Sequence, residues 1–334
     1  MRRALVTGAT GMLGSYIVRQ LLASRVGVRA LVRRPGEAGW LRELGAELMQ
    51  GELADARSLR AAAAGCDAVF HAAAAIGPEP TWETFRVGNV EGTAHVVDAC
   101  AQANARLVHV SSTAVYGDSR YQFAPVDERM VLPTLPEGDA YGRSKQEAER
   151  IVLEAHAAHR IWGAIVRPPI MYGEHDRQFA PRIAVALDRG FFPLCAGGRT
   201  TLPMVHANAV AEGAVRAASV DAAGGRAYNL TTDFPLTVAE LVRYAAIGLD
   251  RRIRAPSLSL GVSRALFRIL ALGLTVAGRR DLGGHAMGSF EMLVHDNPFS
   301  SERARNELQW SPTIRPEIGV PGAFRWWKAH HGSA

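Results

Sequence analysis

The strongest constraint on this chain is a glycine-rich turn close to its first residue. A short apolar segment, Ala4-Leu-Val-Thr, is followed by three regularly spaced glycines and then by residues with helical spacing. Gly8 lets the turn close tightly, Gly11 lets the backbone approach a pyrophosphate, and Gly14 lets the helix pack on the strand. The helix N-terminus adds free amides and the positive end of the helix dipole. In this strand, turn and helix order, the triplet predicts a dinucleotide-binding unit, with a purely structural turn as the alternative.

Short apolar runs alternate with segments of helical spacing through the first half of the chain. The apolar runs cover 4–7, 28–32, 68–73, 107–111 and 163–166. This alternation predicts the α/β class, with a Rossmann-type doubly wound parallel sheet and helices on both faces. After Pro168 the regular pattern ends, and glycines and prolines divide the chain into short pieces.

We therefore expect two parts in the chain. The Rossmann domain should cover 1–170, with a return segment near 203–232. A smaller, interleaved substrate-binding lobe should cover 171–202 and 233–334.

Composition and charge exclude several classes of protein. Hydrophobic residues make up 48% of the 334 residues, which is enough for a sizeable core. The net charge of +6 suits an anionic ligand, yet the arginines are scattered, so we expect a solvated surface and no nucleic-acid partner. Cys66, Cys100 and Cys195 include no C-x-x-C pair, and the histidines share no ligand spacing. We expect no disulfide framework, no metal and a cytoplasmic location, because the N-terminus also lacks the apolar region of a secretory signal.

Two arginines follow the second apolar run. In a dinucleotide-binding unit this strand ends beside the adenosine ribose, where an acidic residue would bind the 2′-hydroxyl of NAD. Val32 stands at that position, and Arg33 and Arg34 come directly after it. A pair of guanidinium groups matches a 2′-phosphate, so NADP is the expected cofactor and NAD the alternative. The alternative interpretation is that both arginines are solvated surface residues.

A tyrosine and a lysine four residues apart form a candidate acid/base pair. Four residues are one helical turn, so Tyr141 and Lys145 would share a helix face. A nearby cation lowers the pKa of a phenol from about 10, which makes Tyr141 a candidate general acid or base for a carbonyl or hydroxyl oxygen. The spacing is common by chance, with an exposed helix face as the alternative, but here it follows a predicted strand that ends at Ser112. We expect Ser112 to hydrogen-bond the reacting oxygen while Tyr141 exchanges the proton.

Taken in order, the motifs of this chain resemble those of the extended short-chain dehydrogenase/reductases, the NAD(P)-dependent epimerase/dehydratase family. The family includes nucleotide-sugar epimerases and dehydratases, 3β-hydroxysteroid dehydrogenases and dihydroflavonol reductases, and the resemblance covers nearly the whole chain. Its landmarks are Thr7-Gly-Ala-Thr-Gly-Met-Leu-Gly14, Gly51-Glu-Leu-Ala-Asp55, Phe70-His-Ala-Ala73, Asn89-Val-Glu-Gly-Thr93, Ser111-Ser-Thr-Ala-Val-Tyr-Gly117, Tyr141-Gly-Arg-Ser-Lys145 and Arg167-Pro-Pro-Ile-Met-Tyr-Gly173.

The resemblance implies roles for individual residues. Tyr141 would be the acid/base, Lys145 its pKa-lowering partner and a ribose ligand, and Ser112 the ligand of the substrate oxygen. Asn89 would belong to the polar support of the site. Glu52 stands where the family often has an aspartate that meets the adenine amine. Besides Lys145, Tyr141, Arg33 and Arg34, the implied cofactor contacts are Gly8, Thr10, Gly11, Met12, Leu13, Gly14, Glu52, Leu53, Ala72, Ala73, Ala74, Pro168 and Ile170.

Two positions favour an apolar substrate over a nucleotide sugar. In the branch of the family that acts on nucleotide sugars, the R-x-x-N-x-Y-G segment offers an asparagine to the diphosphate, and Ile170 stands there. An arginine is also usual where Leu202 stands. The loss of both groups leaves a diphosphate without charge-assisted partners. Arg199 is close enough to restore one contact in a different loop register, so a nucleotide sugar stays open as the alternative.

The stretch 257–278 differs from the rest of the second half because almost all of its residues are apolar or small. The exceptions are Arg264 and Arg268, which a helical wheel places on one narrow stripe. Two arginines near the middle argue against a membrane-spanning helix. A peripheral contact with an anionic bilayer surface is one interpretation, and the others are a lobe helix over an apolar substrate pocket and a dimer contact. The flanking arginines that favour the bilayer are Arg251, Arg252, Arg254, Arg279 and Arg280.

These observations lead to one principal function and two alternatives. The principal function is an NADP-dependent reductase or dehydrogenase that acts on a ketone or secondary alcohol of a largely apolar small molecule, sterol-like, polyketide-like or flavonoid-like. The first alternative is a nucleotide-sugar epimerase or dehydratase that keeps NAD tightly bound. The second is a non-enzymatic dinucleotide sensor, which the intact Ser112, Tyr141 and Lys145 disfavour. We expect the protein to form a homodimer.

Overall fold

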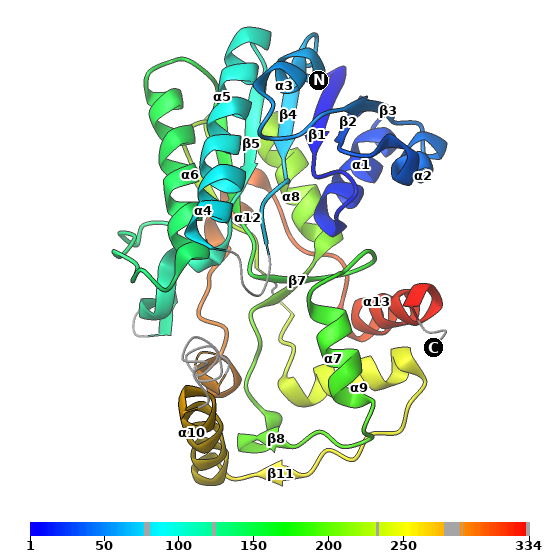
Figure 1. Ribbon diagram of the computed structural model, residues 1–334, viewed down its shortest axis with the longest axis vertical. Helices are drawn as coiled ribbons and strands as arrows, with labels where there is room; N and C mark the ends of the chain where they lie inside the picture. Colours follow the sequence, from blue (N-terminus) through cyan, green and yellow to red (C-terminus); the bar gives the residue numbers. More distant parts are fainter. Residues whose placement is uncertain (77–80, 122–124, 232–233, 277–287, 289, 332–334) are drawn as a thin grey trace.

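Seven parallel strands form the central sheet of the protein (Figure 1). The computed structural model describes residues 1–76, 81–121, 125–231, 234–276, 288 and 290–331. The strands of the sheet are β1 (Arg3–Thr7), β2 (Gly27–Val32), β3 (Glu47–Gln50), β4 (Ala68–His71), β5 (Arg106–Val110), β6 (Gly163–Arg167) and β10 (Ala227–Asn229). Their spatial order is β10-β6-β5-β4-β1-β2-β3. Strands β2 and β3 therefore lie on one side of β1, and the later strands lie on its other side. This order confirms the predicted Rossmann-type sheet. It puts the topological switch point, where sheets of this type bind their ligands, at the carboxyl ends of β1 and β4.

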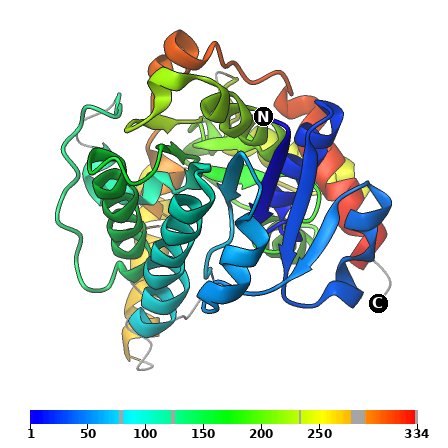
Figure 2. The same cartoon turned by 90° about the horizontal axis from the view of Figure 1, so that it is seen from above.

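Helices cover both faces of this sheet (Figure 2). The pair α1 and α8 packs on one face, whereas α3, α5 and α6 form a layer on the other. The helices are α1 (Met12–Ala23), α2 (Gly39–Glu43), α3 (Ala56–Ala63), α4 (Trp82–Phe85), α5 (Gly92–Ala103), α6 (Ala140–Ala157), α7 (Phe179–Leu187), α8 (Ala207–Ser219), α9 (Val238–Leu249), α10 (Leu260–Val276), α12 (Glu302–Leu308) and α13 (Pro316–His331).

Each strand sends alternate side chains into the two helical layers. On β1, Val6 packs into the layer of α1 and α8, whereas Leu5 packs into the layer of α3 and α5. Phe70 and Val69 of β4 alternate in the same way. Because both faces are covered, the central residues of these strands are all apolar, and this is why the sequence shows them as continuous apolar runs.

The edge strand β3 has no counterpart among the predicted strands. Its sequence, Glu47-Leu-Met-Gln50, has polar residues at both ends, and both of those ends are exposed. A four-residue strand at the sheet edge does not need an apolar run, so hydrophobicity alone could not reveal it.

The second part of the molecule lies beyond the carboxyl ends of the strands (Figure 1). Helices α7, α9 and α13 share an apolar core. Two small parallel sheets accompany them, one formed by β7 (Ile170–Tyr172) and β9 (Met204–His206), the other by β8 (Leu194–Cys195) and β11 (Ser257–Leu258). Within 203–232, α8 packs on α1 and β10 joins the main sheet, so this segment returns to the first part. The boundaries assigned to the two domains stay a prediction.

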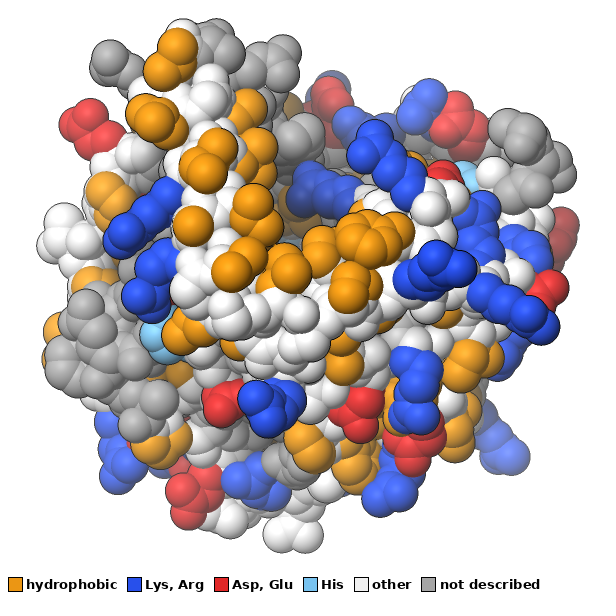
Figure 3. All heavy atoms as spheres, turned by 90° about the horizontal axis from the view of Figure 1, so that it is seen from below, with side chains coloured by type: hydrophobic (Ala, Val, Ile, Leu, Met, Phe, Trp, Pro, Cys, Tyr) orange, Lys and Arg blue, Asp and Glu red, His pale blue; other side chains and the backbone are white. Residues whose placement is uncertain are grey.

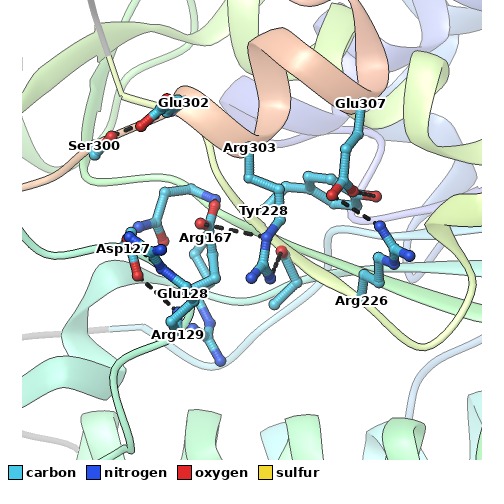
Figure 4. A network of polar contacts seen from close by, with 12 residues as sticks. Asp127, Glu128, Arg129, Arg167, Arg226, Tyr228, Ser300, Glu302, Arg303 and Glu307 are labelled. Atoms are coloured by element: carbon cyan, nitrogen blue, oxygen red, sulfur yellow. Dashed lines mark hydrogen bonds and ion pairs between the residues drawn. The ribbon is translucent and has the colours of Figure 1, made fainter.

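Helix α12 packs against the edge strand β10 (Figure 4). The Glu307 carboxylate accepts a hydrogen bond from the Tyr228 hydroxyl at 2.8 Å and pairs with Arg226 at 2.8 Å. Trp310, which follows α12, is fully buried and donates its indole N–H to the Ala209 carbonyl of α8 at 2.7 Å. Glu307 and Trp310 therefore connect this part of the chain to both the sheet edge and α8.

The stretch 257–278 contains β11 and α10, and its last two residues lie outside the described part, as do Arg279 and Arg280. No helix within the described residues combines the length and the hydropathy needed to cross a bilayer.

Candidate active site

The three predicted catalytic side chains come together beyond the carboxyl end of β5. Ser112 is the second residue after β5, and Tyr141 and Lys145 lie in the first two turns of α6. The start of α6 is set by Asp139, whose carboxylate accepts the Gly142 amide at 2.9 Å. Because the cap fixes the first turn, it also fixes the direction in which Tyr141 leaves the helix.

Tyr141 and Ser112 form a hydrogen-bonded pair. Burial raises the pKa of Tyr141, and the hydrogen bond to Ser112 lowers it by a smaller amount. The expected lowering by Lys145 is not found, because its ammonium lies 6.0 Å from the centre of the Tyr141 ring and is directed at a backbone carbonyl. The phenol is therefore protonated at neutral pH and is suited to donate a proton.

Lys145 is buried, with 3% of its surface exposed. Its ammonium donates a hydrogen bond of 2.9 Å to the Val110 carbonyl at the end of β5. Burial lowers the pKa of Lys145 to about 8, against the opposing effect of the Glu149 carboxylate one turn further along α6. The ammonium form still predominates at neutral pH, which keeps a positive charge behind the tyrosine.

Asn89 links the loop after β4 to the catalytic helix. Its carboxamide oxygen accepts the Ala75 amide at 2.7 Å, and its Nδ2 donates to the Ser144 hydroxyl at 3.0 Å. Ser144 in turn donates to the Tyr141 carbonyl at 2.8 Å. Sequence reasoning missed Ser144, although it lies inside the Tyr141 to Lys145 motif. A turn of π-helix, Arg86–Glu91, carries Asn89 into this position.

The glycine-rich turn is shaped for close backbone approach. Gly8 has a φ of +70°, and a Cβ added there would lie 2.6 Å from the Ala73 nitrogen. A Cβ on Gly14 would lie 2.1 Å from the Gly8 carbonyl oxygen, so α1 touches the turn at this point. Gly11 is different, because an added Cβ would meet only the Gly8 oxygen, at 3.3 Å. No side chain caps α1 at Gly11, so its first amides are free for a phosphate.

The other predicted residues of this turn divide into two groups. Thr10 and Met12 are partly exposed at the start of α1, where they can flank a pyrophosphate. Leu13 is buried in the core between α1 and the sheet. Its side chain therefore supports the turn from inside, and only its backbone can take part in binding.

A buried polar chain that sequence reasoning missed supports this turn from below. The Thr7 hydroxyl accepts the Ala73 amide at 3.2 Å and contacts His71 Nδ1 at 2.8 Å. His71 Nε2 lies 3.1 Å from the Thr93 hydroxyl, which donates to the Asn89 carbonyl at 2.6 Å. These contacts require the neutral His71 tautomer with its proton on Nε2. Burial, together with the charge of Lys145, lowers the pKa of His71 to about 3, consistent with that neutral form.

The predicted nicotinamide-side residues follow the ends of two strands. Ala72, Ala73 and Ala74 come directly after β4 and are partly exposed beside Gly8. Pro168 follows β6 and is buried, and its carbonyl accepts the Thr113 amide at 3.0 Å. Ile170 begins β7 and is partly exposed. The loops after β4, β5 and β6 therefore meet around Ser112.

The predicted adenosine-side residues lie on the opposite side of the switch point. Arg33 and Arg34 follow β2 and are exposed, and Arg34 pairs with Glu37 at 2.7 Å. The described part of the chain offers Arg33 no ion-pair partner. Glu52 is exposed after β3, whereas Leu53 is partly buried against α5.

A buried ion pair lies behind the catalytic helix. Arg167 of β6 donates two hydrogen bonds to Glu149 of α6, at 2.8 and 2.6 Å, and both side chains are at most 6% exposed. Arg167 also donates to the Tyr116 hydroxyl at 2.8 Å, and Tyr116 donates to Asn229 of β10 at 2.9 Å. Figure 4 shows Arg167 beside the loop that carries Glu128, whose carboxylate accepts the Asn229 amide at 2.5 Å. The chain of contacts thus runs from α6 across β6 to β10.

Leu202 and Arg199, two of the residues that bear on the substrate class, differ in exposure. Leu202 is 3% exposed and packs in the core of α7, α9 and α13. Arg199 lies on the surface. In the ranges that the structure covers, no cluster of histidine, cysteine, aspartate or glutamate is arranged to hold a metal ion.

Two features define the class of protein: the glycine-rich turn after β1, and the set of Ser112, Tyr141 and Lys145 beyond β5. Together they define a Rossmann-fold oxidoreductase that depends on a nicotinamide dinucleotide. Residues 4–231 match the NAD dependent epimerase/dehydratase family. The chain belongs to this family, the extended short-chain dehydrogenase/reductases, as its motifs predict.

Two relatives in this family carry names that describe reductases. A 4-hydroxy-2-methyl-3-oxo-4-farnesyl-3,4-dihydroquinoline-1-oxide ketoreductase from Stigmatella aurantiaca is 37% identical over 235 residues, which are 70% of this chain and 69% of the relative. A 2-alkyl-3-oxoalkanoate reductase from Stenotrophomonas maltophilia is 29% identical over 334 residues, which are 95% of this chain and 97% of the relative.

Two solved structures have the same fold over essentially their whole length. The crystal structure of gox2253 has a TM-score of 0.76 and 26% identity and covers 100% of both chains. UDP-glucuronic acid 4-epimerase from Bacillus cereus in complex with NAD has a TM-score of 0.74 and 18% identity and covers 98% of this chain and 99% of its own. The second likeness concerns the fold alone.

Proposed function

We propose that this enzyme reduces a ketone, or oxidises the corresponding secondary alcohol, on a largely apolar small molecule with NADP(H) as cofactor. The observation that carries the proposal is the hydrogen-bonded pair of Ser112 and Tyr141 beside the buried Lys145. This set stands at the carboxyl ends of the strands, where Rossmann folds bind their ligands.

The side chains have distinct tasks in this reaction. Ser112 hydrogen-bonds the carbonyl oxygen and holds it against Tyr141. Tyr141, kept protonated by burial, donates its phenolic proton to that oxygen as negative charge develops on it. The Ser112 hydroxyl, hydrogen-bonded to the phenol oxygen, stabilises the phenolate that remains. Lys145 holds a positive charge in the same buried site and, as its motif implies, would bind the cofactor ribose. A bound nicotinamide supplies the hydride in reduction or accepts it in oxidation.

Two features support an apolar substrate. Ile170 and Leu202 replace the asparagine and arginine that would bind a diphosphate, and the burial of Leu202 prevents that position from contributing any contact. Both relatives carry names in which the oxo group belongs to a molecule with a farnesyl or alkyl chain. A nucleotide sugar would have to bind here without these charge-assisted partners.

We further propose that NADP is preferred over NAD. Arg34 is engaged by Glu37, whereas Arg33 is exposed at the end of β2 and is available to a 2′-phosphate. The structural neighbour that carries NAD keeps NAD as the alternative.

The deciding experiment compares two sets of substrates. The purified protein is incubated with NADPH or NADH and hydrophobic ketones of different size, and separately with UDP-sugars without added cofactor. Oxidation of free NADPH that depends on an apolar ketone supports the proposal. Tightly bound NAD, together with conversion of a UDP-sugar and no ketone reduction, would replace it with the epimerase function.

The proposal also includes a cytoplasmic homodimer. All three cysteines are buried and free, which suits a reducing compartment. Sedimentation velocity of the purified protein measures the oligomeric state, and a monomer at micromolar concentration would contradict the dimer.

A further inference from the structure

Helix α10 is an apolar helix most of whose residues are exposed. Of its 17 residues only Ser263 is fully buried. A helix that is hydrophobic around most of its circumference is normally enclosed by protein or lipid. Large apolar side chains are instead open to solvent along its whole length: Leu260, Val262, Leu266, Ile269, Leu270, Leu272 and Val276, with exposures between 42% and 81%.

One narrow face holds α10 on the protein and so decides which side chains point away from it. Ser263 is buried, and Phe267 packs on Phe290 with ring centres 5.2 Å apart. At 3.6 residues per turn, Val262, Ile269 and Val276 lie on the opposite side of the helix. The outward face is therefore aliphatic, with Ile269 at 68% exposure near its centre.

The charged residues of the chain segment that forms this face are all basic. Residues 251–276 contain five arginines and no aspartate or glutamate. Arg264 and Arg268 lie one turn apart on the flank of α10 and are exposed, as are Arg252 and Arg254 before β11. Arg251 is exposed as well, but it is paired with Asp188. Figure 3 shows hydrophobic side chains gathered on this end of the molecule with Lys and Arg side chains beside them.

The position of α10 leaves this face free to meet a flat surface. In Figure 1, α10 lies at the end of the molecule furthest from the N-terminus, below the carboxyl ends of the strands. Phe191 adds an apolar side chain that is 52% exposed, and its backbone forms a bridge with Arg254, which precedes β11. Thus aliphatic side chains project from the same end that carries the arginines.

From these observations we propose that α10 docks the enzyme on the surface of a bilayer that contains anionic lipids. The outward aliphatic side chains enter the boundary between headgroups and acyl chains, and the flanking arginines bind the headgroup phosphates. Contact between two copies through this same face would set arginines against arginines, whereas an anionic bilayer complements them. In this arrangement α10 lies in the membrane surface, and no helix among the described residues is long and apolar enough to cross the bilayer.

The test measures binding to vesicles and does not depend on catalytic activity. The full-length protein is sedimented with vesicles of phosphatidylcholine alone and with vesicles that also contain phosphatidylglycerol. We expect binding to the anionic vesicles, little binding to the neutral ones, and release at high salt, because the arginine contribution is screened.

Two variants of α10 examine its two contributions. Ile269→Ser combined with Leu272→Ser should lower vesicle binding by about tenfold or more, because two aliphatic side chains are lost from the lipid boundary. Arg264→Gln combined with Arg268→Gln should lower binding to anionic vesicles by roughly tenfold or more, since each arginine near the surface contributes about fivefold.

Matched controls separate this effect from general surface changes. Ile318→Ser on α13 removes the same side chain at 66% exposure, compared with 68% for Ile269, and should bind vesicles as the wild type does. Arg57→Gln combined with Arg60→Gln on α3 removes two exposed arginines at the opposite end of the molecule and should also leave binding unchanged.

Three results would overturn the proposal. The first is wild-type protein that binds neither kind of vesicle. The second is binding that the α10 variants and the controls change equally. The third is an α10 double serine variant that turns a dimer into a monomer in sedimentation velocity while wild-type protein ignores vesicles, because α10 would then be a contact between copies of the chain. Ketone reduction can succeed or fail independently of all three results.

Discussion

Burial acts on Tyr141 and Lys145 in opposite directions on the pKa scale but favours the neutral form of each. It raises the pKa of Tyr141 and lowers the pKa of Lys145 to about 8. At neutral pH the pair therefore consists of a phenol that can donate a proton and an ammonium that still carries its charge. A reductase needs both forms at the same time.

Replacement of Tyr141 by phenylalanine tests this assignment. The ring still packs against Phe85, 5.7 Å away between ring centres, but the proton donor is gone. We expect the kcat for ketone reduction to fall by about 10² to 10⁴, with cofactor affinity and melting temperature nearly unchanged. Steady-state kinetics and cofactor titration provide the measurement. An activity within a factor of ten of the wild type would exclude Tyr141 as the acid.

Arg33 gives a prediction about cofactor choice. If its guanidinium binds a 2′-phosphate, Arg33→Ala should weaken NADPH binding by roughly tenfold or more and leave NADH binding almost unchanged. Arg34→Ala is the matched control, because Arg34 is already paired with Glu37 and should contribute less. Titration of both cofactors into all three proteins decides the matter. Equal losses for NADPH and NADH in the Arg33 variant would show that Arg33 is a surface residue only.

At the scale of the elements, the glycine turn contains two kinds of glycine. Gly14→Ala would drive a Cβ to 2.1 Å from the Gly8 oxygen, so α1 must move off the turn. Gly11→Ala meets only one protein atom, at 3.3 Å, and Gly11 is the position where the backbone is expected to approach a pyrophosphate. We expect Gly14→Ala to lower the melting temperature by several degrees, and Gly11→Ala to weaken cofactor binding with little change in melting temperature. If both variants lost only stability, the turn would be structural.

The ion pair between α6 and β6 provides a second prediction at this scale. Arg167→Met leaves the Glu149 carboxylate buried without its partner and should lower the free energy of unfolding by about 3 to 5 kcal/mol. The double variant, Glu149→Leu with Arg167→Met, removes both charges and should recover a large part of that loss. Denaturant unfolding monitored by circular dichroism gives both values. A double variant that is less stable than the single one would mean that Arg167 acts mainly through Tyr116.

On the scale of the whole molecule, buried histidines should make the fold sensitive to acid. Burial lowers the pKa of His206 to about 4 and the pKa of His71 to about 3, whereas histidine in an unfolded chain titrates near 6.5. Between these values the unfolded chain binds more protons than the folded one. The free energy of unfolding is therefore greatest above pH 6.5 and should fall as the pH drops toward 4, by at most about 1.4 kcal/mol per pH unit for each histidine.

His206→Asn tests the contribution of one of these groups. His206 caps α8 by accepting the Asn208 amide at 3.1 Å, and asparagine can replace that contact without titrating. The variant will be less stable overall, because His206 packs between Tyr16 and Tyr172. Its stability should nevertheless depend less steeply on pH between 6.5 and 4 than that of the wild type. An unchanged slope would assign the acid sensitivity to other groups.

Local sequence was sufficient for the sheet class, the glycine turn and the Tyr141 to Lys145 spacing. These features depend on the helical and strand periods, which repeat over a few residues and can be read along the chain. The same reasoning could not detect β3, whose polar ends leave no apolar run, or the partners of His71, which come from β1 and α5.

Tertiary structure alone decided how strongly the side chains are buried and which distant groups meet. It buried Tyr141, which raises the pKa of the phenol, and it directed Lys145 at the Val110 carbonyl, so the expected lowering is absent. It also brought Glu149 next to Arg167 and Asn89 next to Ser144. The members of each pair lie on different elements, so the helical and strand periods do not relate them. It also left α10 attached by one narrow face. The sequence by itself determined that this stretch is apolar and flanked by arginines, whereas packing determined that its aliphatic side chains remain in solvent, because burial depends on what lies opposite a helix.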